Sequence, residues 1–242
     1  MKKKIFVVAL VVCILAISIA SATIAYFTDT ASATNTFTSG NVAIEMTEAA
    51  VKADELGHLV KDDTVDRKEA TEEGATFDYG KIFPMQTIYK DPTVQNTGSE
   101  KAYIGAIITI KNDEGTIDDL LTVTGETNKT AVNEFITGLV SNGANYTVKY
   151  AEVKDDSDQV IALQIYIIKT EALAGADDGN GESADPFFTG VKIPSTWDND
   201  EMAKCKTLSV SVKAYAVQTT GFANAEAAIQ AAFGSDFANY FN

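Results

Sequence analysis

The chain has 242 residues, 45% of them hydrophobic, with 4 prolines, 2 cysteines and a formal net charge of −15 at pH 7. This length allows one globular domain with a full-sized core, or two small ones, after an export segment is removed. The negative charge repels nucleic acid and anionic lipid, so it argues against a nucleic-acid-binding protein and against a protein held on an anionic membrane surface.

Residues 1–25 have the features of a signal peptide. Three lysines at positions 2–4 precede an uncharged apolar run over residues 5–24, and small residues lie near its end. The run is also long enough to span a bilayer, so an uncleaved anchor is the alternative. In either case the body of the protein is expected outside the membrane, and only this segment contacts the bilayer.

Two cleavage sites fit the small-residue pattern, one after Ala22 and one after Ala25, which would leave Tyr26 as the first mature residue. Cleavage at either site removes three lysines and leaves 16 basic residues against 34 acidic ones, a net charge of −18. The mature chain would keep one cysteine, Cys205, which cannot form an internal disulfide. The fold therefore has to be stable through its core alone.

Residues 41–96 begin with a short strand at Val42–Met46, after a Ser39-Gly40-Asn41 turn. Residues 48–75 are rich in Glu, Asp, Lys and Ala. We interpret this stretch as a solvated acidic insertion, partly helical because Val51, Leu56, Leu59 and Val60 lie near one helical face. A further strand pattern covers residues 88–96.

The rest of the chain is dominated by strand signals. Residues 102–110 are almost continuously apolar, as in a strand buried on both faces. Residues 146–153 and 159–168 read as a hairpin around an Asp-rich turn, residues 187–193 as a short strand, and residues 208–217 as a cleanly alternating one.

Two helices are expected, over residues 130–140 and, capped by Asn224 and stopped by Gly234, over residues 225–233. Many short strands with few helices predict a mainly β protein, an antiparallel β-sandwich with two or three short helices in insertions and at the C-terminus.

The sequence lacks the common hydrolytic motifs. His58 is the only histidine and is expected to be a solvated surface residue, so neither a zinc-protease helix nor a nucleophile triad is indicated. Residues 176–187 resemble a calcium loop without its first and last acidic ligands. We interpret them as a flexible turn, with weak calcium binding as the alternative; the candidate ligands are Asp177, Asp178, Asn180 and Asp185.

Three segments together resemble one family of exported proteins. The first runs from Ala25 to Ile44, the second from Phe83-Pro84-Met85-Gln86 to Asn96-Thr97-Gly98-Ser99, and the third from Val191 to Phe222. In order and spacing they are similar to the TasA/camelysin family of Firmicutes, whose members are cut by a dedicated SipW-type signal peptidase. The resemblance spans nearly the whole mature chain except residues 48–75, and it favours cleavage between Ala25 and Tyr26.

The resemblance implies a single jelly-roll-like domain over residues 26–242. It also implies a secreted subunit of an extracellular biofilm-matrix or cell-surface fibre of a Gram-positive bacterium. In such fibres the N-terminal segment of one subunit completes the sheet of the next, and a head-to-tail contact that does not close gives a filament. The implied partners are other copies of the chain, the signal peptidase and an accessory matrix protein.

Residues 26–37 suit a donor strand because they contain no proline, one charge and an aromatic residue at each end. The alternative is a frayed terminus or a strand in the chain's own sheet. The candidate donor residues are Tyr26, Phe27, Thr28, Asp29, Thr34, Thr36 and Phe37.

Two other functions stay open. Camelysin-type members of the family are labelled metallopeptidases, but a single histidine and a single mature cysteine do not supply a zinc ligand set. We therefore expect no enzyme, no catalytic residue and no cofactor. The remaining alternative is a monomeric surface-associated or spore-associated adhesin.

Overall fold

The computed structural model describes residues 28–30, 41–69, 82–112, 132, 134–176, 181–204 and 208–241. The order of the elements in these ranges confirms a mainly β chain with short helices. The helices are α3 (Asn199–Lys204), α4 (Ala225–Phe233) and α5 (Ala238–Phe241). The strands are β1 (Thr28–Thr30), β2 (Ile44–Glu48), β3 (Val51–Ala53), β4 (Leu59–Lys61), β5 (Lys68–Glu69), β6 (Thr87–Tyr89), β7 (Thr93–Asn96), β8 (Ala102–Asn112), β9 (Ile136–Thr137), β10 (Tyr146–Lys154), β11 (Val160–Lys169), β12 (Gly190–Lys192) and β13 (Leu208–Gln218).

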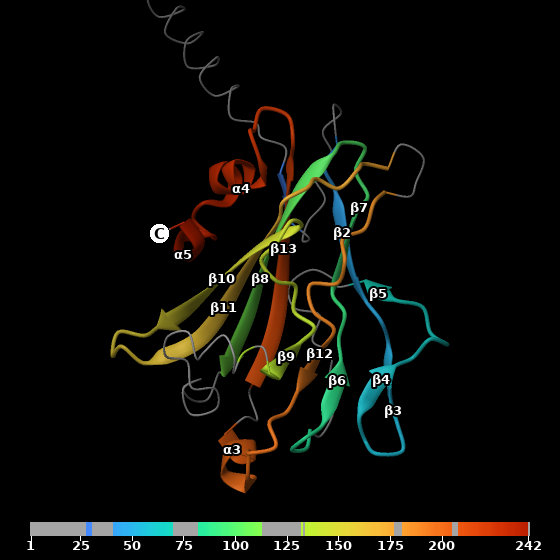
Figure 1. Ribbon diagram of the computed structural model, residues 1–242, viewed down its shortest axis with the longest axis vertical. Helices are drawn as coiled ribbons and strands as arrows, with labels where there is room; N and C mark the ends of the chain where they lie inside the picture. The colour runs from blue at the N-terminus through green and yellow to red at the C-terminus, as the bar shows by residue number, and fades with distance from the viewer. Residues whose placement is uncertain are drawn as a thin grey trace, which may run out of the picture.

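The long strands form one sheet and the short strands form the layer that faces it (Figure 1). The first sheet has five strands in the order β1-β13-β8-β11-β10, all paired antiparallel. The facing layer contains the sheets β3-β4-β6-β12-β9 and β5-β2-β7. Its pairs are antiparallel except that of β4 with β6. The arrangement is the β-sandwich that the spacing of strands and turns predicts.

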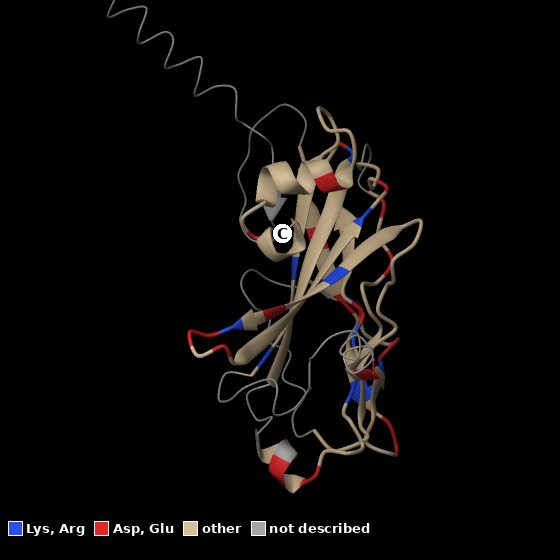
Figure 2. Cartoon of the chain, turned by 60° about the vertical axis from the view of Figure 1, so that its left-hand side comes forward, with Lys and Arg blue, Asp and Glu red and all other residues tan. Residues whose placement is uncertain are grey.

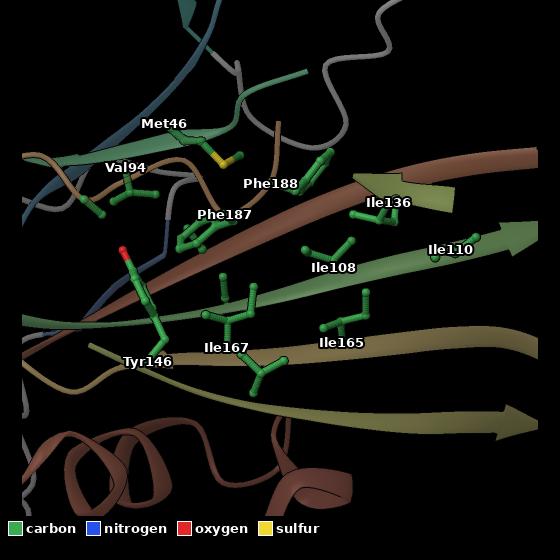
Figure 3. Close-up of a cluster of buried hydrophobic side chains, with 14 of the residues drawn as sticks. Met46, Val94, Ile108, Ile110, Ile136, Tyr146, Ile165, Ile167, Phe187 and Phe188 are labelled. Carbon is green, nitrogen blue, oxygen red and sulfur yellow. The ribbon is translucent and has the colours of Figure 1, made fainter. Parts of the chain in front are cut away.

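The main core lies between these layers. Figure 3 shows Ile108, Ile165 and Ile167 of the long sheet pointing toward Met46 and Phe188 of the facing layer. The three isoleucines are fully buried. β8 contributes to both sides of its sheet, which explains why residues 102–110 are almost continuously apolar rather than alternating. The prediction of a strand buried on both faces is confirmed.

A second, smaller core covers the outer face of the long sheet near the end of β13. There α4 packs against β13, β8 and β11, and α5 packs against β10. Gly105 permits the close approach, since a Cβ at this position would lie 3.0 Å from Ile229 of α4 and from Phe237. Asn224 caps α4 through its side chain, which accepts a hydrogen bond from the Ala227 N–H, as its sequence position predicts.

The acidic insertion proposed for residues 48–75 is in part a structural component of the sandwich, and its predicted helix is wrong. Residues 51–53 and 59–61 form the antiparallel pair β3–β4, and residues 68–69 pair with β2. Glu48 and Ala49 are buried. The apolar positions fit a helical period by chance, because β4 pairs with β6 and this tertiary contact selects the strand.

Arg67 fastens this insertion to the sandwich. Its Nη1 donates to the Asp91 carboxylate at 2.6 Å, and its other donors reach Thr47 and Thr93. The Asp91 carboxylate also accepts from the Ala49 N–H at 2.8 Å. Such a charge-assisted, partly desolvated arrangement is stronger than a surface ion pair. Composition shows the charges of the insertion but not this pairing.

Some other helices and strands begin or end at residues that differ from the prediction, because strand pairing with distant segments changes their bounds. The helix over residues 130–140 does not continue to Val140, since Ile136–Thr137 pairs with β12 and Gly138 has a φ of 64°. The strand pattern over residues 88–96 is divided into β6 and β7. The hairpin of residues 146–168 is confirmed as β10 and β11, and α4 has the predicted bounds.

Candidate functional site

The candidate site is the outer edge of β13. On one side this strand pairs with β8 along its whole length, from Leu208 opposite Asn112 to Gln218 opposite Ala102. On the other side it pairs with β1 only at three positions, Tyr215 to Val217. Among the described residues, the first seven positions of β13 have no partner strand on that side. This leaves a row of backbone hydrogen-bonding groups at a sheet edge.

Burial along β13 changes where its pairing with β1 ends. Residues 214–217 are buried, with Ala216 and Val217 fully so. Leu208, Val210 and Val212 pack against the main core and yet are only half-buried. The core of the sandwich is therefore partly exposed along the first half of β13, as expected for a strand that lacks a neighbour.

The opposite face of β13 is divided in the same way. Tyr215 and Val217 lie in the second core, where the Tyr215 ring is 4.8 Å from Phe233 between centroids. Ser209 and Ser211, in the first half, are exposed to solvent. The first half of β13 is thus amphipathic, with apolar side chains toward the core and polar ones outward. A strand of matching alternation could add there, with backbone bonds providing affinity and the apolar positions setting the register.

The second core carries the clearest electrostatic effects near this site. Burial raises the pKa of Tyr215 well above its usual 10, and the nearby Asp236 carboxylate raises it further. Burial also raises the pKa of Tyr240, whose hydroxyl donates to the Glu226 carboxylate. Both rings are neutral at physiological pH and act as packing groups rather than as acids or bases.

The structure brings part of the predicted donor segment to this edge. Thr28 and Asp29 belong to β1, where Thr28 is opposite Val217 and Asp29 opposite Ala216. Three residues of the segment thus form a strand in the chain's own sheet, which was one of the two alternatives for it. The other donor candidates, Tyr26, Phe27, Thr34, Thr36 and Phe37, and the cleavage-site residue Ala25, lie outside the described residues.

Sequence reasoning did not identify the outer edge of β13 as a candidate site. It recognised the alternation of residues 208–217 but treated this stretch as an ordinary strand. The signal was the composition of the outward side, which carries Ser209, Ser211 and Lys213, although the neighbouring β8 is apolar on both faces. A strand at an open edge is expected to be more polar than its fully paired neighbour.

The candidates for metal chemistry are not brought together in the described part of the chain. Asp177, Asp178 and Asn180 lie outside that part, and Asp185 is exposed. No group of three or more His, Cys, Asp or Glu residues suited to a metal ion occurs among the described residues. His58 is half-buried rather than solvated, and its Nδ1 accepts a hydrogen bond from the Thr87 N–H at 3.0 Å. Its imidazole therefore connects the β3–β4 turn to β6.

Within the described ranges, no helix is long and apolar enough to cross a bilayer. Figure 2 shows the described acidic positions on loops and turns and also on helices and strands. No protein-family model, curated protein or solved structure matches the chain.

Proposed function

We propose that this chain is a secreted structural protein, the subunit of an extracellular fibre, and that it assembles by donor-strand exchange of its N-terminal segment. The observation that supports this proposal most directly is the outer edge of β13. It is paired at three of its eleven positions in the described structure, and its apolar residues are half-exposed along the rest. An edge of this kind accepts an extended segment from another molecule.

The register of β1 indicates how such a segment would fit. Thr28 lies opposite Val217 and Thr30 opposite Tyr215, in antiparallel pairing. Continued one residue at a time, the same register in a donor from another copy would place Phe37 opposite Leu208. The eleven positions of β13 would then be matched by residues 27–37. This is nearly the segment that the sequence analysis selects as a donor.

The side-chain alternation of that segment is consistent with this register. Residues opposite each other in an antiparallel pair share a face of the sheet. The register would direct Ala31, Ala33 and Phe37 to the core side, next to the half-buried residues of β13. Ser32, Thr34 and Thr36 would lie on the other face, opposite exposed residues of β13. Asp29 and Asn35 are the polar residues that would fall on the core side.

Exchange between copies would cost little free energy, because only the short pairing of β1 with β13 has to be broken. Replacing three paired residues in the same chain with a longer pairing between chains increases the number of backbone bonds. Each backbone hydrogen bond contributes about 1 kcal/mol net. The operation is a domain swap, and one that runs from each copy to the next without closing generates a filament.

Mixed single-cysteine variants test the proposal. Phe37→Cys and Leu208→Cys are made separately in a Cys205→Ser background, mixed in equal amounts under assembly conditions, and oxidised. If a donor of one copy lies in the predicted register on another, a disulfide-linked dimer forms, because opposite residues lie within disulfide range. A mixture of Thr36→Cys with Leu208→Cys is the control, since residue 36 would face the other side of the sheet.

The outcomes separate the function from the register. Filaments in electron micrographs together with the 37–208 crosslink support both. Filaments with a crosslink only in the control mixture would mean that exchange occurs in a different register. If the secreted, N-terminally sequenced protein forms no filaments at any pH or salt concentration, the fibre proposal fails.

A further inference from the structure

The other edge of the five-stranded sheet is β10, and one side chain occupies part of it. The Asn142 carboxamide bonds both backbone groups of Val148. Its Oδ1 accepts from the Val148 N–H at 2.5 Å, and its Nδ2 donates to the Val148 C=O at 3.0 Å. Val148 lies opposite Ile167 of β11. The Asn145 C=O accepts from Thr170, next to β11, so the alternation of the ladder turns the backbone groups of Val148 away from β11. Asn142 therefore bonds Val148 from the side that a further strand would occupy.

This pair of bonds reproduces what a neighbouring strand would provide. In an antiparallel ladder, one residue exchanges both an N–H and a C=O with its partner, and a primary amide has the same donor and acceptor. Asn142 therefore saturates the Val148 backbone at the point where an added strand would pair.

The loop that carries Asn142 is itself tied to the sheet. The Gly143 N–H donates to the Tyr146 C=O at 3.0 Å. The Thr170 N–H donates to the Asn145 C=O at 2.9 Å, and the Thr170 hydroxyl donates to the Ala144 C=O at 2.5 Å. These bonds hold residues 142–145 across the start of β10, so the carboxamide is presented to Val148 by a constrained loop rather than by a freely moving one.

We propose that Asn142 is an edge-closing residue, which prevents β10 from pairing with the extended N-terminal segment of a second copy. The choice of this occupant rests on the proposed function, because an assembling fibre presents donor segments at high local concentration. The closure of the edge does not depend on that function. With β10 closed, strand addition to the five-stranded sheet is confined to β13.

The packing behind β10 indicates why this edge needs closing. Val148 and Tyr146 are buried, with exposed fractions of 4% and 5%. Val148 belongs to the same core as Ile165 and Ile167 of β11. A strand that added here would therefore extend a sheet edge whose side chains already belong to the core, a feature that promotes edge-to-edge association.

The test compares Asn142→Ala with Asn145→Ala in the mature chain. Both remove an asparagine from the same exposed loop, but no hydrogen bond is observed for the Asn145 side chain within the described structure. For Asn142→Ala we expect amide exchange at Val148 to become about tenfold faster in the dilute monomer, because its acceptor is removed. Sedimentation at rising concentration should show oligomers that Asn145→Ala does not form. Moderate salt limits repulsion between the acidic copies.

Asn142→Asp provides a second variant if the alanine form does not fold. The carboxylate still accepts from the Val148 N–H, so the amide of residue 148 should stay protected from exchange. It cannot donate to the Val148 C=O, so association should still increase. Unchanged oligomer distributions for a folded Asn142 variant would overturn the proposal.

A synthetic peptide of residues 26–37 identifies the occupant. It should protect β10 amides from exchange in Asn142→Ala and leave them unchanged in Asn145→Ala. If Asn142→Ala associates but the peptide does not bind β10, the edge is closed by Asn142 and the donor segment is the wrong occupant. If the wild-type chain forms no filaments, the proposed function is contradicted. The comparison of Asn142→Ala with Asn145→Ala is not affected by that result.

Discussion

β13 and β10 flank the same sheet, but their outward backbone groups are satisfied in different ways. On β10 a side-chain amide bonds both groups of Val148 and belongs to a loop that is tied to the sheet. On β13 the partner is β1, which pairs at three positions. β1 lies shortly after the expected export signal. One edge is thus closed by a local contact, and the other by a strand that another copy could replace.

In the proposed fibre, this difference would let a single sheet polymerise in one direction. Two equally open edges would allow strands to add on both sides and would favour disordered aggregation. One open edge together with one donor segment gives a head-to-tail contact, in which each copy donates once and accepts once. The predictions below test this asymmetry, beginning with the largest expected effect.

Removal of residues 26–36 eliminates the proposed donor together with β1. We expect filaments to be absent from electron micrographs, while circular dichroism shows a folded monomer. The free energy of unfolding should fall by about 1–3 kcal/mol, because only the three-residue pairing is lost from the monomer. A chain with a Gly/Ser segment of the same length controls for spacing. Intact filaments after the deletion would exclude a donor role for these residues.

Val212→Lys places a charge on the core side of the open edge. An inward-pointing charge prevents strand addition because its burial beneath a donor leaves it without solvent. Assembly followed by light scattering should be lost, with a decrease of about 1–2 kcal/mol in unfolding free energy, since Val212 is only half-buried. Ser211→Lys, on the exposed side of the same strand, should assemble normally. Equal behaviour of the two variants would contradict addition at this face.

Acid should accelerate assembly by several-fold. At neutral pH the mature copies would carry about 18 negative charges each, and protonation of carboxylates toward the sequence pI of about 4.4 reduces their repulsion. Salt at neutral pH should have the same direction of effect, because it screens exposed charges. Filament growth that is slower at pH 5 than at pH 7 would indicate that ionised carboxylates hold the copies together.

High pH should lower the free energy of unfolding through the second core, where α4 and α5 pack on the sheet. The pKa values of Tyr215 and Tyr240 are raised in the folded state, so the unfolded chain loses these protons first as pH increases. The contribution of these two groups to stability is therefore fully present below about pH 10 and decreases above it. Urea unfolding at several pH values measures this, and Tyr240→Phe should flatten the decrease. A constant free energy of unfolding up to pH 11 would contradict the effect.

The success of sequence-based prediction varied with the range of the interactions involved. The hairpin of β10 and β11 and the helix α4 were predicted closely, because both depend on local signals, an Asp-rich turn and an Asn cap. The segment around β3 and β4 was predicted wrongly. Its four apolar residues fit a helix, and only pairing with β6, which is distant in sequence, makes part of it a strand. Local periodicity contains no information about such a partner.

The same distinction applies to the candidate site. The sequence indicated the donor segment, since its composition and its place after an export signal are local properties. It did not indicate that β13 lies at a sheet edge or that Asn142 bonds the edge of β10. Whether a strand lies in the middle of a sheet or at its edge depends on which strands pair with it, and that pairing is not a local property of the strand.

The sequence by itself determined the class of the fold, the amphipathic strands and the acidic charge, because each follows from residue type and spacing along the chain. Only the tertiary structure decided which strands became edges, which groups satisfy those edges, and that Thr28–Thr30 pairs with the end of β13. The physical reason is that the hydrogen bonds of a strand are made to a neighbour that can lie anywhere in the chain.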